Sequence, residues 1–247
     1  MRALHVTNAI LRREWSAYIE SPLAFVFLIA FLLLAGIFTF TLGGFFERGD
    51  ASLAAFFNWM PWLFLFLVPA VGMRLWSEER RLGTIELLLT MPITPWQAIL
   101  GKFLASWAFL ILAIALSFPI VLTVNWLGSP DNGMILAGYV GCALLAGSYL
   151  SIACLASACT RNQVIAFIFS IMACLVLNLL GFPPVLDLIS RWVGPSGIEA
   201  IAGFSTLSHF DGFQKGILDT RDVVYFCSIA IFSLFVTGVV LRGHRAG

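Results

Sequence analysis

The sequence predicts an all-α integral membrane protein, and its composition and hydropathy pattern carry that prediction. Hydrophobic residues make up 60% of the 247 residues and charged residues 11%, whereas soluble domains have about 45–50% apolar and about 25% charged residues. A helix needs roughly 20 mostly apolar residues to cross about 30 Å of hydrocarbon. Six stretches meet this requirement: Leu23–Leu42, Ala54–Leu75, Phe103–Leu127, Met134–Ala158, Val164–Phe182 and Val223–Leu241. We therefore expect six transmembrane helices in a single domain over residues 1–247.

Residues 3–22 are predicted to form a helix that lies on the membrane surface. The pattern of an amphipathic helix places apolar side chains on one face and polar side chains on the other. The apolar face holds Leu4, Leu11, Trp15 and Tyr18, and the opposite face holds His5, Arg13, Ser16 and Glu20. Pro22 then separates this helix from the first span, because a residue before proline avoids the helical region. A plain flanking segment is the alternative.

Prolines and short apolar stretches predict further features between and within the spans. Pro61 and Pro69 in the second span and Pro119 in the third are expected to kink their helices. Residues 183–222, between the fifth and sixth spans, contain two apolar stretches that are too short to cross a membrane. We expect short re-entrant or interfacial helices there, with a small extracytoplasmic cap as the alternative.

The distribution of Lys and Arg predicts the orientation. Cytoplasmic loops of membrane proteins carry an excess of these residues. If the N-terminus is inside, ten of the 14 lie in inner segments: Arg2, Arg12, Arg13, Arg74, Arg80, Arg81, Lys102, Arg161, Arg242 and Arg245. We therefore expect both termini in the cytoplasm and residues 183–222 outside. The net charge of +1 and the scattered basic residues argue against binding of nucleic acid.

The sequence offers little for catalysis, metal binding or ion coupling. Its five cysteines show no CxxC spacing, which argues against a zinc site or a disulfide framework. The six apolar stretches contain no Asp, Glu or His, although ion-coupled carriers usually keep such groups at membrane depth. A pair of His209 and Asp211 would be the one surface site for an intramembrane enzyme, and a structural histidine is the other interpretation. An enzyme and an ion-coupled carrier or channel remain the alternative functions.

The segment from Ser77 to Pro92 is the strongest functional signal. Four consecutive charged residues interrupt the apolar sequence and must face water or a soluble partner, and we expect them to form a hinge before a short helix. Gly83 suits a left-handed turn, and Thr84 suits the start of a short helix that Pro92 would stop. Apolar residues within that short helix have no use in a solvated loop. We therefore expect residues 77–94 to dock on a partner, and we expect Thr94 to cap the next helix with Pro95 at its first position.

This segment resembles the signature of ABC-2-type transporter permeases. The similarity rests on ERRLGTIELLLTMP at residues 79–92 and on Gly101-Lys102-Phe103. Supporting similarities are Cys159-Thr160-Arg161-Asn162-Gln163 and His209-Phe210 with the residues up to Tyr225. The resemblance covers essentially the whole chain and is greatest to the short permeases of the gliding-motility-associated branch.

The resemblance implies a permease subunit of an ATP-binding cassette exporter in the bacterial inner membrane. It implies a second permease copy, two separate cytoplasmic ATPase subunits and an auxiliary subunit with an extracytoplasmic domain. ATP and Mg would be bound by the ATPase chains, since this sequence has no GxxxxGK[ST] loop and needs no cofactor of its own. The residues implied to couple to the ATPase are Glu78, Glu79, Arg80, Arg81, Gly83, Thr84, Ile85, Glu86, Leu87, Leu88 and Pro92.

Overall fold

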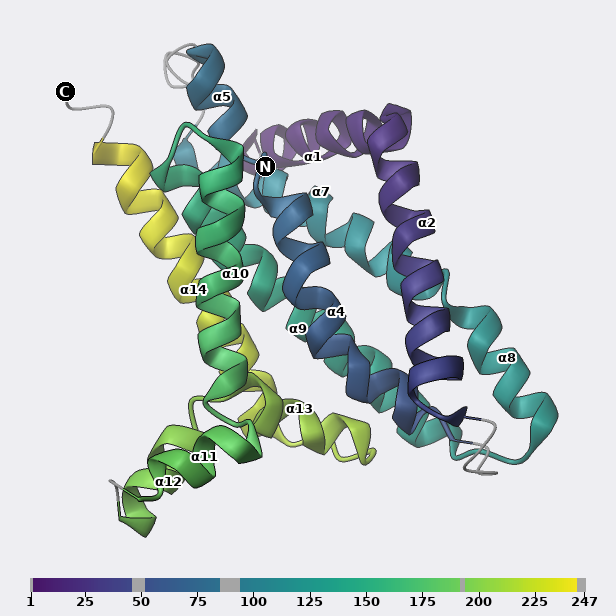
Figure 1. Cartoon of the computed structure of the whole chain (residues 1–247). Helices are drawn as coiled ribbons and strands as arrows, with labels where there is room; N and C mark the ends of the chain where they lie inside the picture. The colour runs from purple at the N-terminus through teal and green to yellow at the C-terminus, as the bar shows by residue number, and fades with distance from the viewer. Residues whose placement is uncertain (1, 46–51, 85–93, 192–193, 244–247) are drawn as a thin grey trace.

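Helices form the part of the chain that the computed structural model describes, which comprises residues 2–45, 52–84, 94–191 and 194–243 (Figure 1). In chain order the helices are α1 (Arg2–Glu20), α2 (Pro22–Ile37), the π-helix η1 (Phe38–Leu42), α4 (Ala54–Gly72), α5 (Ser77–Leu82), α7 (Pro95–Ala115), α8 (Phe118–Leu127), α9 (Asn132–Cys159), α10 (Gln163–Leu179), α11 (Pro183–Ile189), α12 (Pro195–Ala202), α13 (Thr206–Gln214) and α14 (Thr220–Gly243). Within the described ranges the predicted all-α class is confirmed.

Five helical segments in the described residues are long and apolar enough to span a membrane. They are α2 with η1, α4 with α5, α7 with α8, α9, and α14. The predicted fifth span is shorter than expected, because α10 has 17 residues and the chain bends by 73° before α11. The bend precedes Pro183, which begins α11, and Phe182 has the extended backbone that a residue before proline prefers. Counting α10 and α11 as one broken span gives six.

The predicted prolines act differently in the two spans that contain them. The third span breaks between α7 and α8 just before Pro119, and Ser117 in the break donates a hydrogen bond to the Ile114 carbonyl at 2.6 Å. By contrast, α4 continues through Pro61 and Pro69 without ending. The Asn178 side chain on α10 reaches the Pro61 carbonyl at 3.5 Å. A neighbouring helix thus contributes a polar contact near Pro61, as is usual in membrane bundles.

Helices α4 and α9 form the centre of the bundle. Within the most apolar 18 residues of each span, 61% of the residues are buried in the span that begins with α4 and 67% in α9. The corresponding shares are 22% in the first span and 28% in α14. Two glycines allow α4 and α9 to approach closely. A Cβ on Gly72 would lie 2.4 Å from Ala153 Cβ, and a Cβ on Gly138 would lie 2.4 Å from the Phe57 ring. Small residues at such contacts are typical of helix packing in membranes.

Helix α1 lies across one end of the bundle, at a large angle to the spans (Figure 1). The predicted polar face is exposed, while Leu11, Trp15 and Tyr18 of the predicted apolar face are partly buried. Tyr18 stacks on Phe109 of α7 with ring centroids 5.0 Å apart, and its hydroxyl contacts Ser106 Oγ at 2.9 Å. The apolar face of α1 therefore packs on α7 of its own chain.

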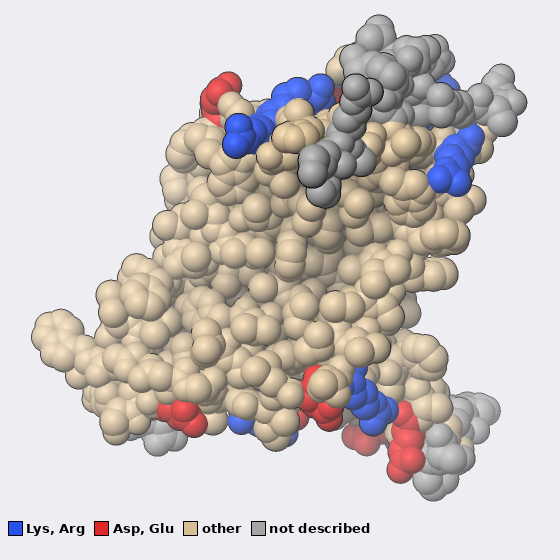
Figure 2. Space-filling model, turned by 180° about the vertical axis from the view of Figure 1, so that it is seen from behind, with Lys and Arg blue, Asp and Glu red and all other residues tan. Residues whose placement is uncertain are grey.

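The two ends of the bundle are charged, and the band between them is not. On the face that Figure 2 shows, Lys, Arg, Asp and Glu side chains lie only near the two ends of the bundle. Helices α1 and α5 and the last turn of α14 lie at one end, and α11 and α12 lie at the other (Figure 1). The two short apolar stretches predicted to be helical within residues 183–222 correspond to α11 and α12. Helix α13 is an additional helix that was not predicted.

Candidate functional site

The predicted partner-binding segment begins with a helix of its own. Residues 77–82 form α5, although we expected the charged residues to be a hinge before a later helix. Gly83 ends α5 in the left-handed conformation with φ 73°, as predicted. Thr84 Oγ1 donates back to the Glu79 carbonyl at 3.4 Å. The remaining predicted coupling residues, Ile85, Glu86, Leu87, Leu88 and Pro92, lie outside the described residues.

The charge order of α5 explains why these residues are helical. Glu78 and Glu79 occupy the first turn, and Arg80 and Arg81 occupy the last turn. Acidic residues near the positive N-terminus and basic residues near the negative C-terminus stabilise a helix. Glu78 and Arg81 also lie three positions apart, with a 4.0 Å ion pair on an exposed surface. Such a pair contributes only about 0.2–0.5 kcal/mol.

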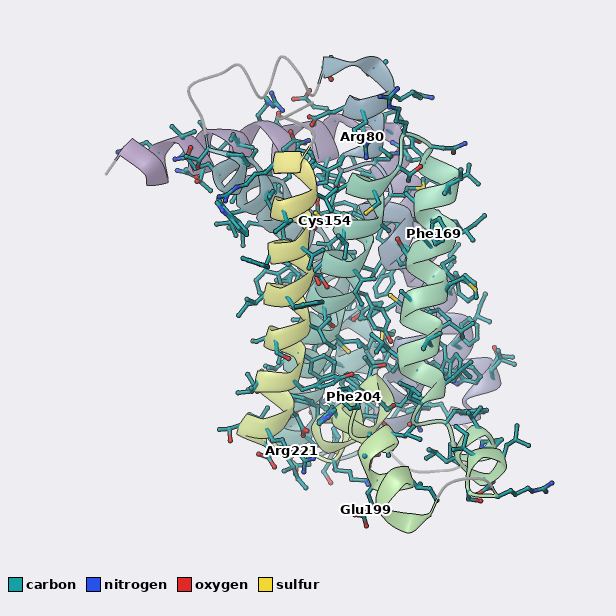
Figure 3. All side chains as sticks on the ribbon, turned by 90° about the vertical axis from the view of Figure 1, so that its left-hand side faces the viewer. Arg80, Cys154, Phe169, Glu199, Phe204 and Arg221 are labelled. Carbon is teal, nitrogen blue, oxygen red and sulfur yellow. The ribbon has the colours of Figure 1, made fainter. Side chains whose placement is uncertain are left out.

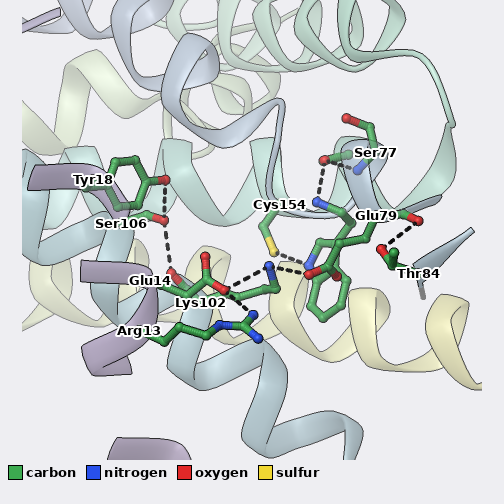
Figure 4. Close-up of polar contacts among 11 residues, drawn as sticks. Arg13, Glu14, Tyr18, Ser77, Glu79, Thr84, Lys102, Ser106 and Cys154 are labelled. Carbon is green, nitrogen blue, oxygen red and sulfur yellow. Dashed lines mark hydrogen bonds and ion pairs between the residues drawn. The ribbon is translucent and has the colours of Figure 1, made fainter. Parts of the chain in front are cut away.

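A serine on α9 holds the start of α5. Ser157 Oγ accepts hydrogen bonds from the backbone N–H groups of Trp76 and Ser77 at 3.0 and 2.9 Å, and it donates to the Met73 carbonyl at 2.8 Å. Trp76, 1% exposed, also donates from Nε1 to Cys154 Sγ at 3.2 Å (Figure 4). Because α5 begins on these contacts, its orientation is fixed relative to α9.

Arg80 extends this attachment to the end of α9. Its guanidinium donates to the Ala158 carbonyl, in the last turn of α9. The carbonyls of a last helical turn have no partner within the helix and favour cations. Figure 3 shows Arg80 at the same end of the molecule as α1. Arg80 therefore stabilises the α5–α9 contact, whereas Arg81 and Leu82 are exposed.

A buried lysine connects three elements at this end of the bundle. Lys102 of α7 is 4% exposed, and its ammonium lies 2.9 Å from Glu79 Oε1 of α5 and 3.4 Å from Glu14 Oε1 of α1 (Figure 4). Its Nζ is also 5.4 Å from the centre of the Trp76 ring. Arg13 adds a second cation, 2.7 Å from Glu14. We call Arg13, Glu14, Glu79 and Lys102 the charge cluster.

The electrostatics of the charge cluster favour the charged form of Glu14. Burial of Glu14 acts to raise the pKa of its carboxyl, but Lys102 and Arg13 outweigh burial and hold that pKa below its ordinary value. A buried charge is tolerated only when it is paired. The arrangement is thus an ionic link between α1, α5 and α7.

The roles of Lys102, Glu14 and Ser157 are not among the sequence predictions for the site. Lys102 lies within the Gly101-Lys102-Phe103 motif, which marks its position but does not indicate its partners. The signal that could have identified it is a single lysine directly before a long apolar stretch. Glu14 and Ser157 have no comparable sequence signal, because their contacts join segments far apart in the chain.

His209 does not form the surface pair with Asp211 that we considered. Asp211 pairs with Lys215 instead. His209 is 7% exposed, with Nδ1 2.6 Å from Asp222 Oδ1 and Nε2 3.0 Å from the Gly203 carbonyl. Both ring nitrogens are engaged, so the structure favours the structural interpretation of His209. Among the described residues no group of three His, Cys, Asp or Glu side chains is placed to hold a metal ion.

The comparisons with known proteins agree with the architecture. Residues 50–241 match the model of a family described as ABC-2 family transporter protein. No curated protein sequence is significantly similar to this chain. The matched region begins before α4 and ends within α14, so it includes α5 and Lys102.

Proposed function

Because the chain belongs to the ABC-2 family of transporter membrane proteins, we propose that it is the permease subunit of an ATP-binding cassette exporter driven by separate cytoplasmic ATPases. Members of this family are multi-span permeases without catalytic residues of their own. In the proposed assembly two permease copies form the translocation pathway, and the ATPase chains bind ATP and Mg. An auxiliary subunit with an extracytoplasmic domain completes the proposed complex in a bacterial inner membrane.

The observation that carries this proposal is the attachment of α5. Helix α5 is fixed to α9 by Ser157 and to α1 and α7 by the charge cluster. Its tip nevertheless presents Leu82, 63% exposed, beside Arg81. An exposed apolar side chain at the charged end of a membrane protein fits a contact with a soluble partner better than a solvated loop. Movement of that partner would reach three other helices through α5.

The orientation that the proposal requires places this end in the cytoplasm. Helices α1 and α5 and the last turn of α14 share that end (Figure 1). The basic residues predicted to be cytoplasmic include Arg80, Arg81, Lys102 and Arg161. Residues 183–222 would then lie outside, where the proposed auxiliary subunit would contact them. Export, rather than import, rests on the resemblance of the motif at residues 79–92.

The test is co-purification of the cognate ATPase with variants of the permease. Burial of a leucine side chain contributes about 1.5–3 kcal/mol, so Leu82→Asp should weaken ATPase binding by at least about tenfold. ATP hydrolysis by the complex should fall accordingly. The matched control is Leu218→Asp, since Leu218 is 59% exposed on the short connection between α13 and α14.

Normal ATPase binding by Leu82→Asp would contradict the docking role of α5. Robust ATP hydrolysis by the purified permease alone would contradict the subunit assignment. Loss of binding in both variants would point to a general defect in assembly, which the level of membrane-inserted protein would reveal.

A further inference from the structure

Two adjoining cavities lie in the angle between α1 and α2. The first has a volume of about 300 Å³ and is lined largely by charged side chains: Glu14, Arg74, Glu78, Glu79 and Lys102. The second has a volume of about 260 Å³ and is lined largely by apolar side chains: Ala24, Phe27, Ala30, Ala70, Val71 and Phe109. Tyr18, Ser21 and Arg74 line both cavities, so the two lie side by side.

Two side chains of opposite charge that line the charged cavity each bury one polar atom without a partner. Arg74 Nε and Glu79 Oε2 are buried, and neither has a hydrogen-bond partner in the part of the chain that the structure describes. Glu79 uses only Oε1 to contact Lys102. A buried polar group without a partner is costly. A ligand with an anionic acceptor for the Arg74 guanidinium and an N–H donor for the Glu79 carboxylate complements both charges that line this cavity.

The apolar cavity has the length and chemistry for part of an acyl chain. Its α2 side runs from Ala24 to Ala30, which corresponds to about 9 Å at about 1.5 Å per helical residue. Alanines at positions 24, 30 and 70 leave the space that larger side chains would fill. This cavity lies on the spans α2, α4 and α7, and the charged cavity lies at the charged end. The order of the two cavities matches that of a lipid headgroup and its chain.

We propose that the combined cavity binds one zwitterionic phospholipid with a primary ammonium group, of the phosphatidylethanolamine class. The phosphate contacts Arg74, the ammonium donates to the Glu79 carboxylate, and one acyl chain lies along Ala24–Ala30. Phosphatidylcholine has no N–H donor for Glu79, and phosphatidylglycerol has no cation. The site goes beyond the proposed function, because it needs neither the ATPases nor a transported substrate.

The test measures lipid binding to the full chain in detergent by native mass spectrometry. The probes are phosphatidylethanolamine, phosphatidylcholine and phosphatidylglycerol with the same acyl chains, and inorganic phosphate as a competitor. One phosphatidylethanolamine should bind at least about tenfold more tightly than the other two lipids, because phosphatidylcholine loses the hydrogen bond to the Glu79 carboxylate and phosphatidylglycerol loses the cation that pairs with it. Inorganic phosphate should compete weakly.

Two variants test the charged cavity and the apolar cavity separately. Arg74→Gln should weaken phosphatidylethanolamine binding by at least about tenfold, and Ala30→Phe should do so by filling the groove. Matched controls are Arg161→Gln, at an exposed arginine after α9, and Ala230→Phe, on α14. Both controls should bind the lipid as the unmodified chain does.

Several results would overturn the proposal. Unchanged lipid binding by Arg74→Gln would refute the proposed contact between the phosphate and Arg74, even if Ala30→Phe fails to fold. If phosphatidylcholine binds as tightly as phosphatidylethanolamine, the proposed contact with Glu79 is wrong. Tighter binding of phosphatidylglycerol would assign the cavity to anionic lipids. Phosphate binding that depends on Arg74, together with lipid binding that Ala30→Phe leaves intact, would assign the cavity to a free anion.

Discussion

Replacement of Lys102 by methionine should destabilise the protein more than replacement of any exposed lysine. The substitution keeps most of the side-chain volume but leaves Glu14 and Glu79 without their shared cation. The lysine side chain is 6% exposed and each carboxylate side chain 18%, so solvent screens these charges little. Removal of one partner from a buried ion pair costs about 3–5 kcal/mol.

The lower end of that range applies here, because Glu14 retains Arg13 at 2.7 Å. A loss of about 3 kcal/mol corresponds to a fall in Tm of about 6–12 °C for a chain of this size, at about 2–4 °C per kcal/mol. The assay is thermal denaturation of the purified chain in detergent, followed by circular dichroism. The control is Lys215→Met, because the exposed Lys215–Asp211 pair should contribute no more than about 1 kcal/mol.

A second variant separates the ionic link from loss of packing. The triple variant Lys102→Met with Glu14→Gln and Glu79→Gln removes the unpaired charges along with the lysine. Replacement of a whole buried ion cluster by neutral groups is often close to neutral, so the triple variant should recover most of the lost stability. A Tm of Lys102→Met within about 2 °C of the unmodified chain, or no recovery in the triple variant, would refute the reasoning.

Three further predictions follow from other features. Gly72→Leu should lower Tm strongly and Gly36→Leu should not, because an added Cβ meets another atom at 2.4 Å at Gly72 and none within 4 Å at Gly36; equal effects in thermal denaturation would contradict the packing argument. The pKa of Glu14 is lowered in the folded protein by neighbouring cations that outweigh burial, so its contribution to stability is complete above about pH 4.3 and falls away as the pH drops through the folded pKa. Glu14→Gln should abolish the contribution of Glu14 to the fall of Tm at acid pH. If the variant has the same pH profile of Tm as the unmodified chain, the proposed contribution of Glu14 is wrong. A membrane-impermeant maleimide should modify the exposed Cys159 only from the cytoplasmic side and should not modify Cys227, which is exposed within the span α14; labelling of Cys159 in intact cells would reverse the proposed orientation.

Local sequence signals predicted several helix boundaries. Thr94 and Pro95 begin α7 as expected, and the Gln97 side chain accepts a hydrogen bond from the Thr94 N–H at 2.9 Å. The left-handed conformation of Gly83 was predicted from the residue type alone. These features depend on residues within one or two turns of each other, so a single stretch of sequence contains all the information they require.

Features that depend on distant residues were not predicted. The start of α5 rests on Ser157, 80 positions beyond Ser77, so the charged residues looked like a hinge rather than a helix. The partner of His209 was also missed, although the helix itself excludes Asp211. Residues two positions apart on a helix do not face each other, and α13 contains both. The role of Lys102 likewise depends on α1 and α5 meeting at α7.

The close contact between α4 and α9 has a mechanical consequence for any force applied to α5. Gly72 leaves no room for sliding against Ala153, and Ser157 joins the connection before α5 to the same helix. Helices α4, α5 and α9 should therefore move as one stiff lever whose short arm is α5. The less buried α2 and α14 would take up the displacement. A change in the shape of the membrane-spanning part would then appear as rotation of a rigid core against its outer helices.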